Sequence, residues 1–271
     1  MPARAQLSGS STRSSGSSRH AGLAVQAGGR SDIGRVRPNN EDRLLANLDL
    51  DLYAVADGVG GAVAGEVAAE LAVNVVEEMV AAAVHADSQL DPKTTLVAAL
   101  SQANRRIWNA GLADPRRYGM GTTFVGVLVR DRRLCLAHAG DSRAYRLRGD
   151  DLRLLTRDHN LANDHADRHA DRFGAEGTSL EAQPGHALTR FLGAGSRLTA
   201  EAREIDAEPG DVLLLCSDGI SSVVPPEEIA AVLGEDAPAH ELADRLVARA
   251  LDAGGPDNAT CVVMSFARRA A

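Results

Sequence analysis

The stretch "LYAVADGVGG", residues 52–61, joins an apolar run directly to an aspartate and then to glycines. A short apolar run that ends at a turn signal is typical of a strand. Asp57 would then lie just beyond the end of that strand. Taken alone, an Asp-Gly pair after a strand forms a turn, because Gly tolerates positive φ and Asp bonds its own backbone.

The same pattern recurs elsewhere in the chain. "RLCLAHAGDSR" places Asp141 after an apolar run, "GDVLLLCSDGI" places Asp218 after another, and "GGPDNATCVVM" places Asp257 just before a further one. Because strand ends are rigid and can meet at one sheet edge, these acids can converge on one point. Clustered carboxylates repel one another unless a cation lies among them, and oxygen ligands favour Mg²⁺, Mn²⁺ or Ca²⁺ over zinc. The sequence therefore predicts a carboxylate metal site.

A further segment, "SDIGRVRPNNEDRLL", places Arg37 shortly before Glu41 and Asp42. By itself this segment is typical of a solvated loop with a surface ion pair. Beside a metal cluster it has a second interpretation, because guanidinium suits bidentate contact with phosphate. Two ions about 4 Å apart would activate a water for in-line attack on a phosphoryl group.

Composition restricts the class of protein. The 271 residues are 44% hydrophobic, which is enough for one domain with a large core. Aromatic residues make up only 3% of the chain. The first 30 residues hold four Arg and no acid, so the net charge of −8 corresponds to −12 on residues 31–271. Such an acidic surface repels a phosphate backbone, so we expect no nucleic-acid partner. Without a long apolar stretch or a secretory signal, we expect no membrane span. We also expect a cytoplasmic protein, in keeping with its unpaired cysteines, and a monomer.

The three cysteines, Cys135, Cys216 and Cys261, are widely spaced, and each lies in or beside an apolar run. Their odd number and the absence of a CxxC pair argue against a disulfide framework and against zinc. We expect buried, reduced thiols.

Residues 1–22 are predicted to form a disordered Ser/Gly-rich tail, because this segment has no apolar periodicity, and residues 23–268 a single domain. Two long helices are expected, followed by a group of strands, two more helices and a last strand. The helices span 65–84, 94–112, 225–234 and 240–255, and the strands 122–130, 133–139, 143–148, 152–156, 211–217 and 260–266. Strands in runs and helices in pairs favour an α+β layered fold.

Eight segments, in chain order, resemble the successive motifs of the metal-dependent Ser/Thr protein phosphatases (the PPM family, protein phosphatase 2C type), in their bacterial branch. They are "RVRPNNED", "VADGVGGAVAGE", "GMGTTFVGVLV", "HAGDSRAYRLR", "LTRDHN", "LTRFLGA", "CSDGISSVV" and "GGPDNATCVV", within residues 31–267. The resemblance implies an αββα sandwich of two central antiparallel β-sheets flanked by helix pairs. It also implies hydrolysis of phosphoserine and phosphothreonine by direct attack of a metal-bridging water, opposing a bacterial Ser/Thr kinase.

The resemblance assigns metal ligands residue by residue. Asp57 would bridge two Mn²⁺ or Mg²⁺ ions, and the Gly58 carbonyl would bind one of them. Asp218 and Asp257 would bind the other ion. Asp141 matches a position that holds a third, weaker ion in many bacterial members.

It also assigns the substrate side of the site. Arg37 would hold the substrate phosphate, while Glu41 and Asp42 would orient metal-bound water. Two departures from the family pattern stand out. Val59 replaces the His that animal members use to protonate the leaving group, so a water or another acid must serve. Ala62 replaces a His found in many bacterial relatives and leaves the ligand set intact.

Residues 158–187 occupy the place of the family's mobile flap. His165 and His169 have i, i+4 spacing with Asp167 and Asp171 between and after them, which somewhat resembles a zinc site. Without HExxH or an indicated further ligand, a solvated or substrate-facing flap is the favoured interpretation.

A catalytically weak pseudophosphatase, acting as a regulatory binding module, is the alternative function. A pseudoenzyme usually loses metal carboxylates, whereas Asp57, Asp218 and Asp257 are all present. The sequence therefore favours an enzyme.

Overall fold

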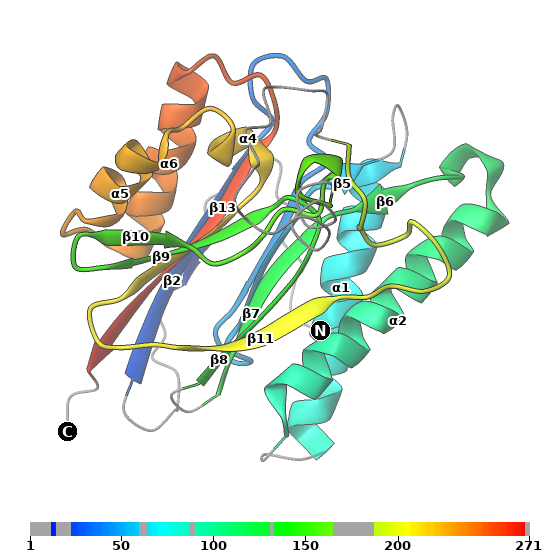
Figure 1. The fold of residues 1–271 in the computed structure, drawn as a ribbon, viewed down its shortest axis with the longest axis horizontal. Coiled ribbons are helices and arrows are strands. Elements are labelled where there is room, and N and C mark those ends of the chain that lie inside the picture. Colours follow the sequence, from blue (N-terminus) through cyan, green and yellow to red (C-terminus); the bar gives the residue numbers. More distant parts are fainter. Residues whose placement is uncertain are drawn as a thin grey trace, which may run out of the picture.

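Two antiparallel β-sheets lie face to face, and helices cover both outer faces (Figure 1). The structure, a computed structural model, describes residues 12–14, 23–59, 64–86, 90–130, 133–164 and 187–268. This confirms the α+β layered fold predicted from the sequence and the αββα sandwich that the family resemblance implied.

The first sheet has six strands in the order β1-β2-β13-β12-β9-β10. Their bounds are β1 Thr12–Ser14, β2 Leu23–Asp32, β13 Ala259–Arg268, β12 Val212–Cys216, β9 Arg143–Arg148 and β10 Asp151–Leu154. The second sheet has five strands in the order β11-β8-β7-β4-β3. These are β11 Glu201–Asp206, β8 Arg133–Ala139, β7 Phe124–Arg130, β4 Leu52–Ala56 and β3 Arg43–Asn47. A short pair, β5 Gly58–Val59 and β6 Gly121–Thr122, stands apart.

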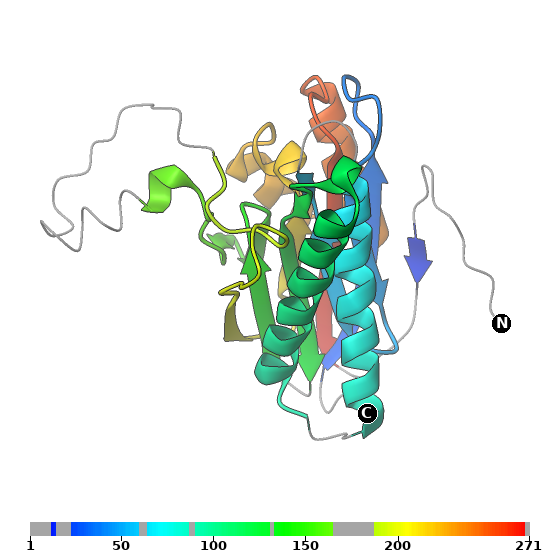
Figure 2. The same ribbon diagram turned by 90° about the vertical axis from the view of Figure 1, so that its right-hand side faces the viewer.

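Helices α1 (Gly65–Ala86) and α2 (Pro92–Ala113) run side by side over the five-stranded sheet (Figure 2). The short η1 (Pro115–Arg117) follows α2. On the other face, α6 (Ala239–Asp252) packs against β2 and β13, beside α5 (Pro226–Leu233) and the single turn α4 (Asp218–Ser221). Both predicted pairs of helices are confirmed.

The start of α2 shows how local sequence sets a boundary. Asp91 is the N-cap, and its carboxylate accepts a hydrogen bond from the Thr94 amide at 2.9 Å. Pro92 occupies the first turn, where its missing N–H costs no helical hydrogen bond.

Strand β4 explains why the opening stretch is apolar without alternation. Leu52 and Ala54 pack in the layer between this sheet and α1 and α2. Tyr53 and Val55 point the other way, into the layer between the two sheets. A strand buried on both faces needs apolar residues at every position, and all five residues of β4 are buried.

The N-terminal segment expected to be a tail contributes β1, whose three residues pair antiparallel with Ala27–Gly29 of β2. The three cysteines are buried and free, as predicted. None of the helices in the described part of the chain is long and apolar enough to cross a membrane. The residues singled out in the flap and beside the Asp-Gly turn lie outside the described residues: Ala62, His165, Asp167, His169 and Asp171.

Gly28 sets how closely α6 can approach the sheet. A Cβ added at Gly28 would lie 2.3 Å from the Cα of His240, which is backbone and cannot rotate away. We therefore expect Gly28→Ala to destabilise the protein by about 1–3 kcal/mol, because α6 must move outward. Gly195→Ala is the control, since no atom lies within 4 Å of its added Cβ. Urea unfolding of the two variants measures the difference, and equal midpoints would contradict the packing argument.

Candidate metal centre

Antiparallel pairing brings the predicted acids of the five-stranded sheet to one edge. Strands β4 and β8 both pair antiparallel with β7, so their C-terminal ends lie at the same side. Asp57 follows β4, and Asp141 follows β8. Strand β3 is antiparallel to β4, so Asp42, which precedes β3, lies at that edge too. Three acids far apart in sequence thus become neighbours.

The six-stranded sheet contributes in the same way. Asp218 comes directly after Ser217 at the end of β12, and Asp257 precedes β13, its antiparallel partner. Arg37 lies in the loop that leaves β2, which also pairs antiparallel with β13. All these ends meet at the upper edge of the sandwich in Figure 1. The acid cluster, defined as Asp42, Asp57, Asp141, Asp218 and Asp257, therefore draws on both sheets.

The main chain of Asp57 is held firmly. Its carbonyl accepts hydrogen bonds from the Thr123 amide and the Thr122 hydroxyl, both at 2.8 Å, and its amide donates to Thr123 Oγ1 at 3.0 Å. Burial raises the pKa of Asp57 well above its ordinary value, and four neighbouring carboxylates raise it further: Asp42, Asp218, Asp141 and Asp257. The negative charge of every other acid in the cluster thus acts on the Asp57 carboxylate.

Asp42 is a buried member of the acid cluster, with 2% of its surface exposed. Its Oδ2 accepts a hydrogen bond from the Ser217 hydroxyl at 2.8 Å, while its Oδ1 is buried without a hydrogen-bond partner among the described residues. Burial is the main reason that the pKa of Asp42 rises to about 7, and the charge of Asp218 adds to it. One oxygen is therefore fixed, and the other is left without a protein donor.

Arg37 lies at the rim of the cluster. Its Nη2 donates to Asp257 Oδ2 at 2.6 Å, and its side chain is 52% exposed. The guanidinium has five N–H donors, so a contact with one carboxylate oxygen leaves others for an anion. Arg37 thus lies near Asp257, Asp57 and Glu41, and its predicted contact with phosphate stays a prediction.

Asn258 holds the loop that bears Glu41. Its Oδ1 accepts from the Glu41 amide at 2.8 Å, and its Nδ2 donates to the carbonyls of Ile33 and Asn39, both at 2.9 Å. The sequence analysis did not identify this role. The residue stands within "GGPDNATCVV", but nothing in that segment indicates that its amide reaches a loop more than two hundred residues away.

Two glycines allow close approach near the same loop. A Cβ at Gly65 would lie 2.1 Å from Glu41 Oε2, and a Cβ at Gly58 would lie 2.3 Å from the carbonyl carbon of Gly65. Glycine is therefore required where the start of α1 meets the Asp-Gly turn. The predicted role of the Gly58 carbonyl as a ligand stays a prediction.

The acid cluster fits divalent cations. Asp218 Oδ1, like Asp42 Oδ1, is buried with no hydrogen-bond partner in the described parts of the chain. Buried polar atoms are nearly always satisfied, and carboxylates that raise one another's pKa are best stabilised by a positive charge. A donor set made of oxygens suits Mg²⁺ or Mn²⁺.

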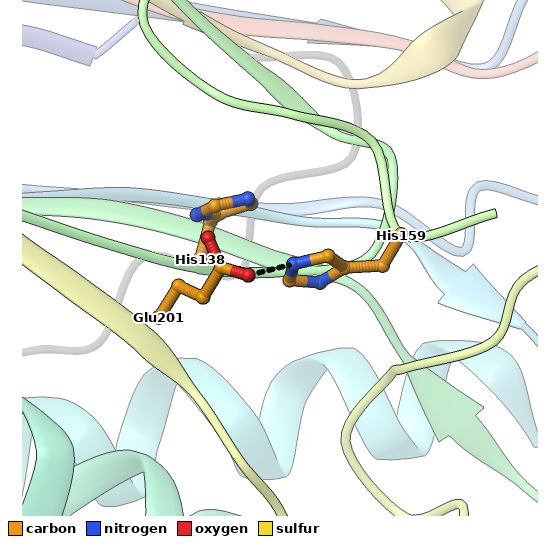
Figure 3. Close-up of side chains that lie close together, drawn as sticks. All are labelled: His138, His159 and Glu201. Carbon is orange, nitrogen blue, oxygen red and sulfur yellow. Dashed lines mark hydrogen bonds and ion pairs between the residues drawn. The ribbon is translucent and has the colours of Figure 1, made fainter. Parts of the chain in front are cut away.

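A second group of titratable side chains lies beside the acid cluster. His138, His159 and Glu201 each offer a ligand-type atom within 4.8 Å of the others (Figure 3). They come from β8, from the segment after β10 and from β11, and sequence reasoning did not connect them.

The comparisons with known proteins agree with this geometry. Residues 29–253 match the family model described as protein phosphatase 2C. The chain therefore belongs to the protein phosphatase 2C family.

Two relatives show how far the similarity extends. The chain is 39% identical over 246 residues to the serine/threonine protein phosphatase PstP of Mycobacterium tuberculosis, covering 89% of this chain and 45% of that protein. It is 31% identical to the serine/threonine phosphatase stp of Listeria innocua, covering 87% and 93%. The chain thus spans less than half of the mycobacterial relative and nearly all of the Listeria one.

Among solved structures, the catalytic domain of PstP in complex with two manganese ions superposes with a TM-score of 0.76 at 36% identity. The match covers 90% of this chain and 99% of that one.

The raised pKa of Asp42 predicts a pH dependence of stability. In protein stripped of metal, the folded state holds this proton up to about pH 7, whereas the unfolded chain releases it near pH 4. The contribution of Asp42 to stability is therefore fully present below pH 4 and is lost as the pH rises through 7. We expect Asp42→Asn to gain in Tm relative to the parent chain between pH 5 and pH 8 in EDTA. Thermal melts across this range measure the difference, and a constant difference would contradict the assignment.

Proposed function

We propose that this protein is a metal-dependent protein serine/threonine phosphatase. The main support is the convergence of five carboxylates from both sheets, two of which have buried oxygens without a protein donor. Membership of the protein phosphatase 2C family and the named phosphatase relatives point to the same activity. Phosphoserine and phosphothreonine side chains of proteins are the proposed substrates.

The residues of the acid cluster would divide the metals among them. Asp57 is the proposed bridging ligand of two core Mn²⁺ or Mg²⁺ ions, because it interacts with every other acid. Asp218 and Asp257 would bind one core ion, the Gly58 carbonyl the other, and Asp141 a third ion. PstP, a relative of similar fold, was solved in complex with two manganese ions, which supports this number for the core.

The remaining site residues would handle the substrate and water. When bound, the ions would neutralise the phosphoryl oxygens and lower the pKa of the attacking water. Arg37 would bind the substrate phosphate with its free N–H groups, and Glu41 and Asp42 would orient the water. Val59, which follows the Asp-Gly pair, is apolar and cannot protonate the leaving group, so that proton comes from a water or another acid.

Several further points belong to this proposal. Residues 23–268 would form the single phosphatase domain, working as a monomer in the cytoplasm. Its substrates would be proteins phosphorylated by a cognate Ser/Thr kinase. The alternative of a pseudophosphatase is not favoured, because every proposed carboxylate ligand is present and placed at one edge.

Metal dependence is the direct test of the proposed function. We expect the protein to hydrolyse p-nitrophenyl phosphate and a phosphothreonine peptide with Mn²⁺ or Mg²⁺, and to lose this activity in excess EDTA, because carboxylate sites for these ions are reversible. Asp57→Asn keeps the shape of the side chain but removes the charge, so it should nearly abolish turnover in a folded protein. Undiminished turnover in EDTA would rule out the proposal.

Arg37 gives a second test. Arg37→Ala removes a charge-assisted contact with phosphate, which should lower kcat/KM by about 10- to 150-fold. Arg153→Ala is the control, because Arg153 is an exposed residue of β10 that pairs with Asp151. Steady-state kinetics at saturating Mn²⁺ measure the effect. If Arg37→Ala behaves like Arg153→Ala, Arg37 does not hold the phosphate.

A further inference from the structure

His159 binds the residue that precedes Asp141 at two points. Its backbone amide donates to the Gly140 carbonyl at 3.0 Å, and its ring Nδ1 accepts from the Gly140 amide at 3.2 Å. Gly140 has a φ of +112°, a conformation that only glycine adopts readily, and an added Cβ would lie 2.6 Å from Thr123. The backbone at Gly140 is thus held in an unusual shape by His159.

These contacts define the tautomer of His159. A backbone amide can only donate, so Nδ1 must be the bare nitrogen and Nε2 must bear the hydrogen. Nε2 accordingly donates to Glu201 Oε1 at 3.1 Å, and Arg190 Nη1 donates to the same oxygen at 2.8 Å. Burial lowers the pKa of His159, which keeps the ring neutral. Both ring nitrogens are therefore occupied by protein partners.

A metal ion fits this group poorly. The rings of His138 and His159 are stacked, with centroids 4.5 Å apart and planes at 18° (Figure 3). Imidazole lone pairs lie in the ring planes, so two nearly parallel rings cannot direct both at one ion. His138 Nε2 also donates to the carbonyl of Arg157 at 3.0 Å. Instead, Glu201 is hydrogen-bonded to His159, and His138 stacks on the His159 ring.

Asp158, the residue before His159, binds the chain on the C-terminal side of Asp141. Asp158 receives a two-pronged contact from Arg143, with Nε at 3.0 Å from Oδ1 and Nη2 at 2.7 Å from Oδ2. The consecutive residues Asp158 and His159 thus bind Arg143 and Gly140, with Asp141 and Ser142 between the two bound positions. The short segment that bears Asp141 is therefore held at both ends.

We propose that His159 is a positioning residue, whose Nδ1 holds the Gly140 amide and thereby aims the Asp141 carboxylate at the acid cluster. The inference rests on the proposed role of Asp141 as ligand of a third ion. It assigns to His159 no contact with substrate or metal. Residues that orient a metal ligand typically change metal affinity by about 10- to 100-fold when they are replaced.

Two substitutions separate the two nitrogens of His159. In His159→Asn the side-chain oxygen can take the place of Nδ1 and still accept from Gly140, but Glu201 is out of reach. In His159→Gln the amide can reach Glu201, but the acceptor for Gly140 is lost. The two variants are similarly polar, so a general loss of packing would affect both alike.

Mn²⁺ titrations, read from the EPR signal of unbound Mn²⁺, report binding without relying on activity. We expect Asp141→Ala to abolish the weakest binding step, His159→Gln to weaken that step by about tenfold or more, and His159→Asn to leave it near the parent value. The tighter steps should stay unchanged in all three variants. Equal effects of Asn and Gln, or none with Gln, would overturn the role of His159 while leaving the phosphatase proposal intact. If Asp141→Ala leaves the weakest Mn²⁺-binding step unchanged, the metal role of Asp141 is wrong and this inference fails with it. If the parent protein shows no tighter Mn²⁺-binding steps at all, the proposed function itself is contradicted.

A measurement on the parent protein tests the same hydrogen bond even if the variants do not fold. Nitrogen-15 NMR of the imidazoles should show His159 with a bare Nδ1 and a protonated Nε2. A protonated Nδ1 would contradict the hydrogen bond from Gly140 and overturn the proposal.

Discussion

Repulsion among the carboxylates at one edge of the sandwich is the constraint on which the architecture of the site depends. Asp57 is nearly surrounded by Asp42, Asp141, Asp218 and Asp257, and burial leaves little water to screen them. Three kinds of positive charge can reduce this repulsion: bound protons, the guanidinium of Arg37 and divalent cations. Only a scaffold that is stable for other reasons can hold these groups together, and the apolar layer between the two sheets provides it.

The supports of the acids share one property: most of them hold the main chain and leave the carboxylate oxygens free. Thr122 and Thr123 bind the backbone of Asp57, and Asn258 binds the amide of Glu41. His159 binds the amide next to Asp141. Asp42 and Asp257 are the exceptions. Ser217 binds one oxygen of Asp42 directly, and Arg37 and the Asn258 amide each bind one oxygen of Asp257. Orientation imposed through the backbone leaves oxygen lone pairs for an ion.

The sequence predicted the elements whose burial leaves a clear pattern. Strands such as β4 and β12 are apolar throughout, and the acids at their ends stand beside glycine. Strands β3 and β11 were not predicted. Both are outer strands of the five-stranded sheet. Strand β11 is mostly exposed and charged, so its composition does not indicate a strand, and it is recognised only by its pairing with β8. His159 and Asn258 were missed because their partners are distant in sequence.

The origin of the acids from both sheets has a mechanical consequence. An ion shared by Asp57 and Asp218 would fasten the end of β4 to the end of β12, at one edge only, while apolar packing joins the sheets along the rest of their length. Removing the ion would then leave a folded sandwich that frays from that edge. Amide hydrogen exchange would quicken at the ends of these strands and stay slow in their middles. The cation would act as a local fastener, and the hydrophobic layer would keep the fold.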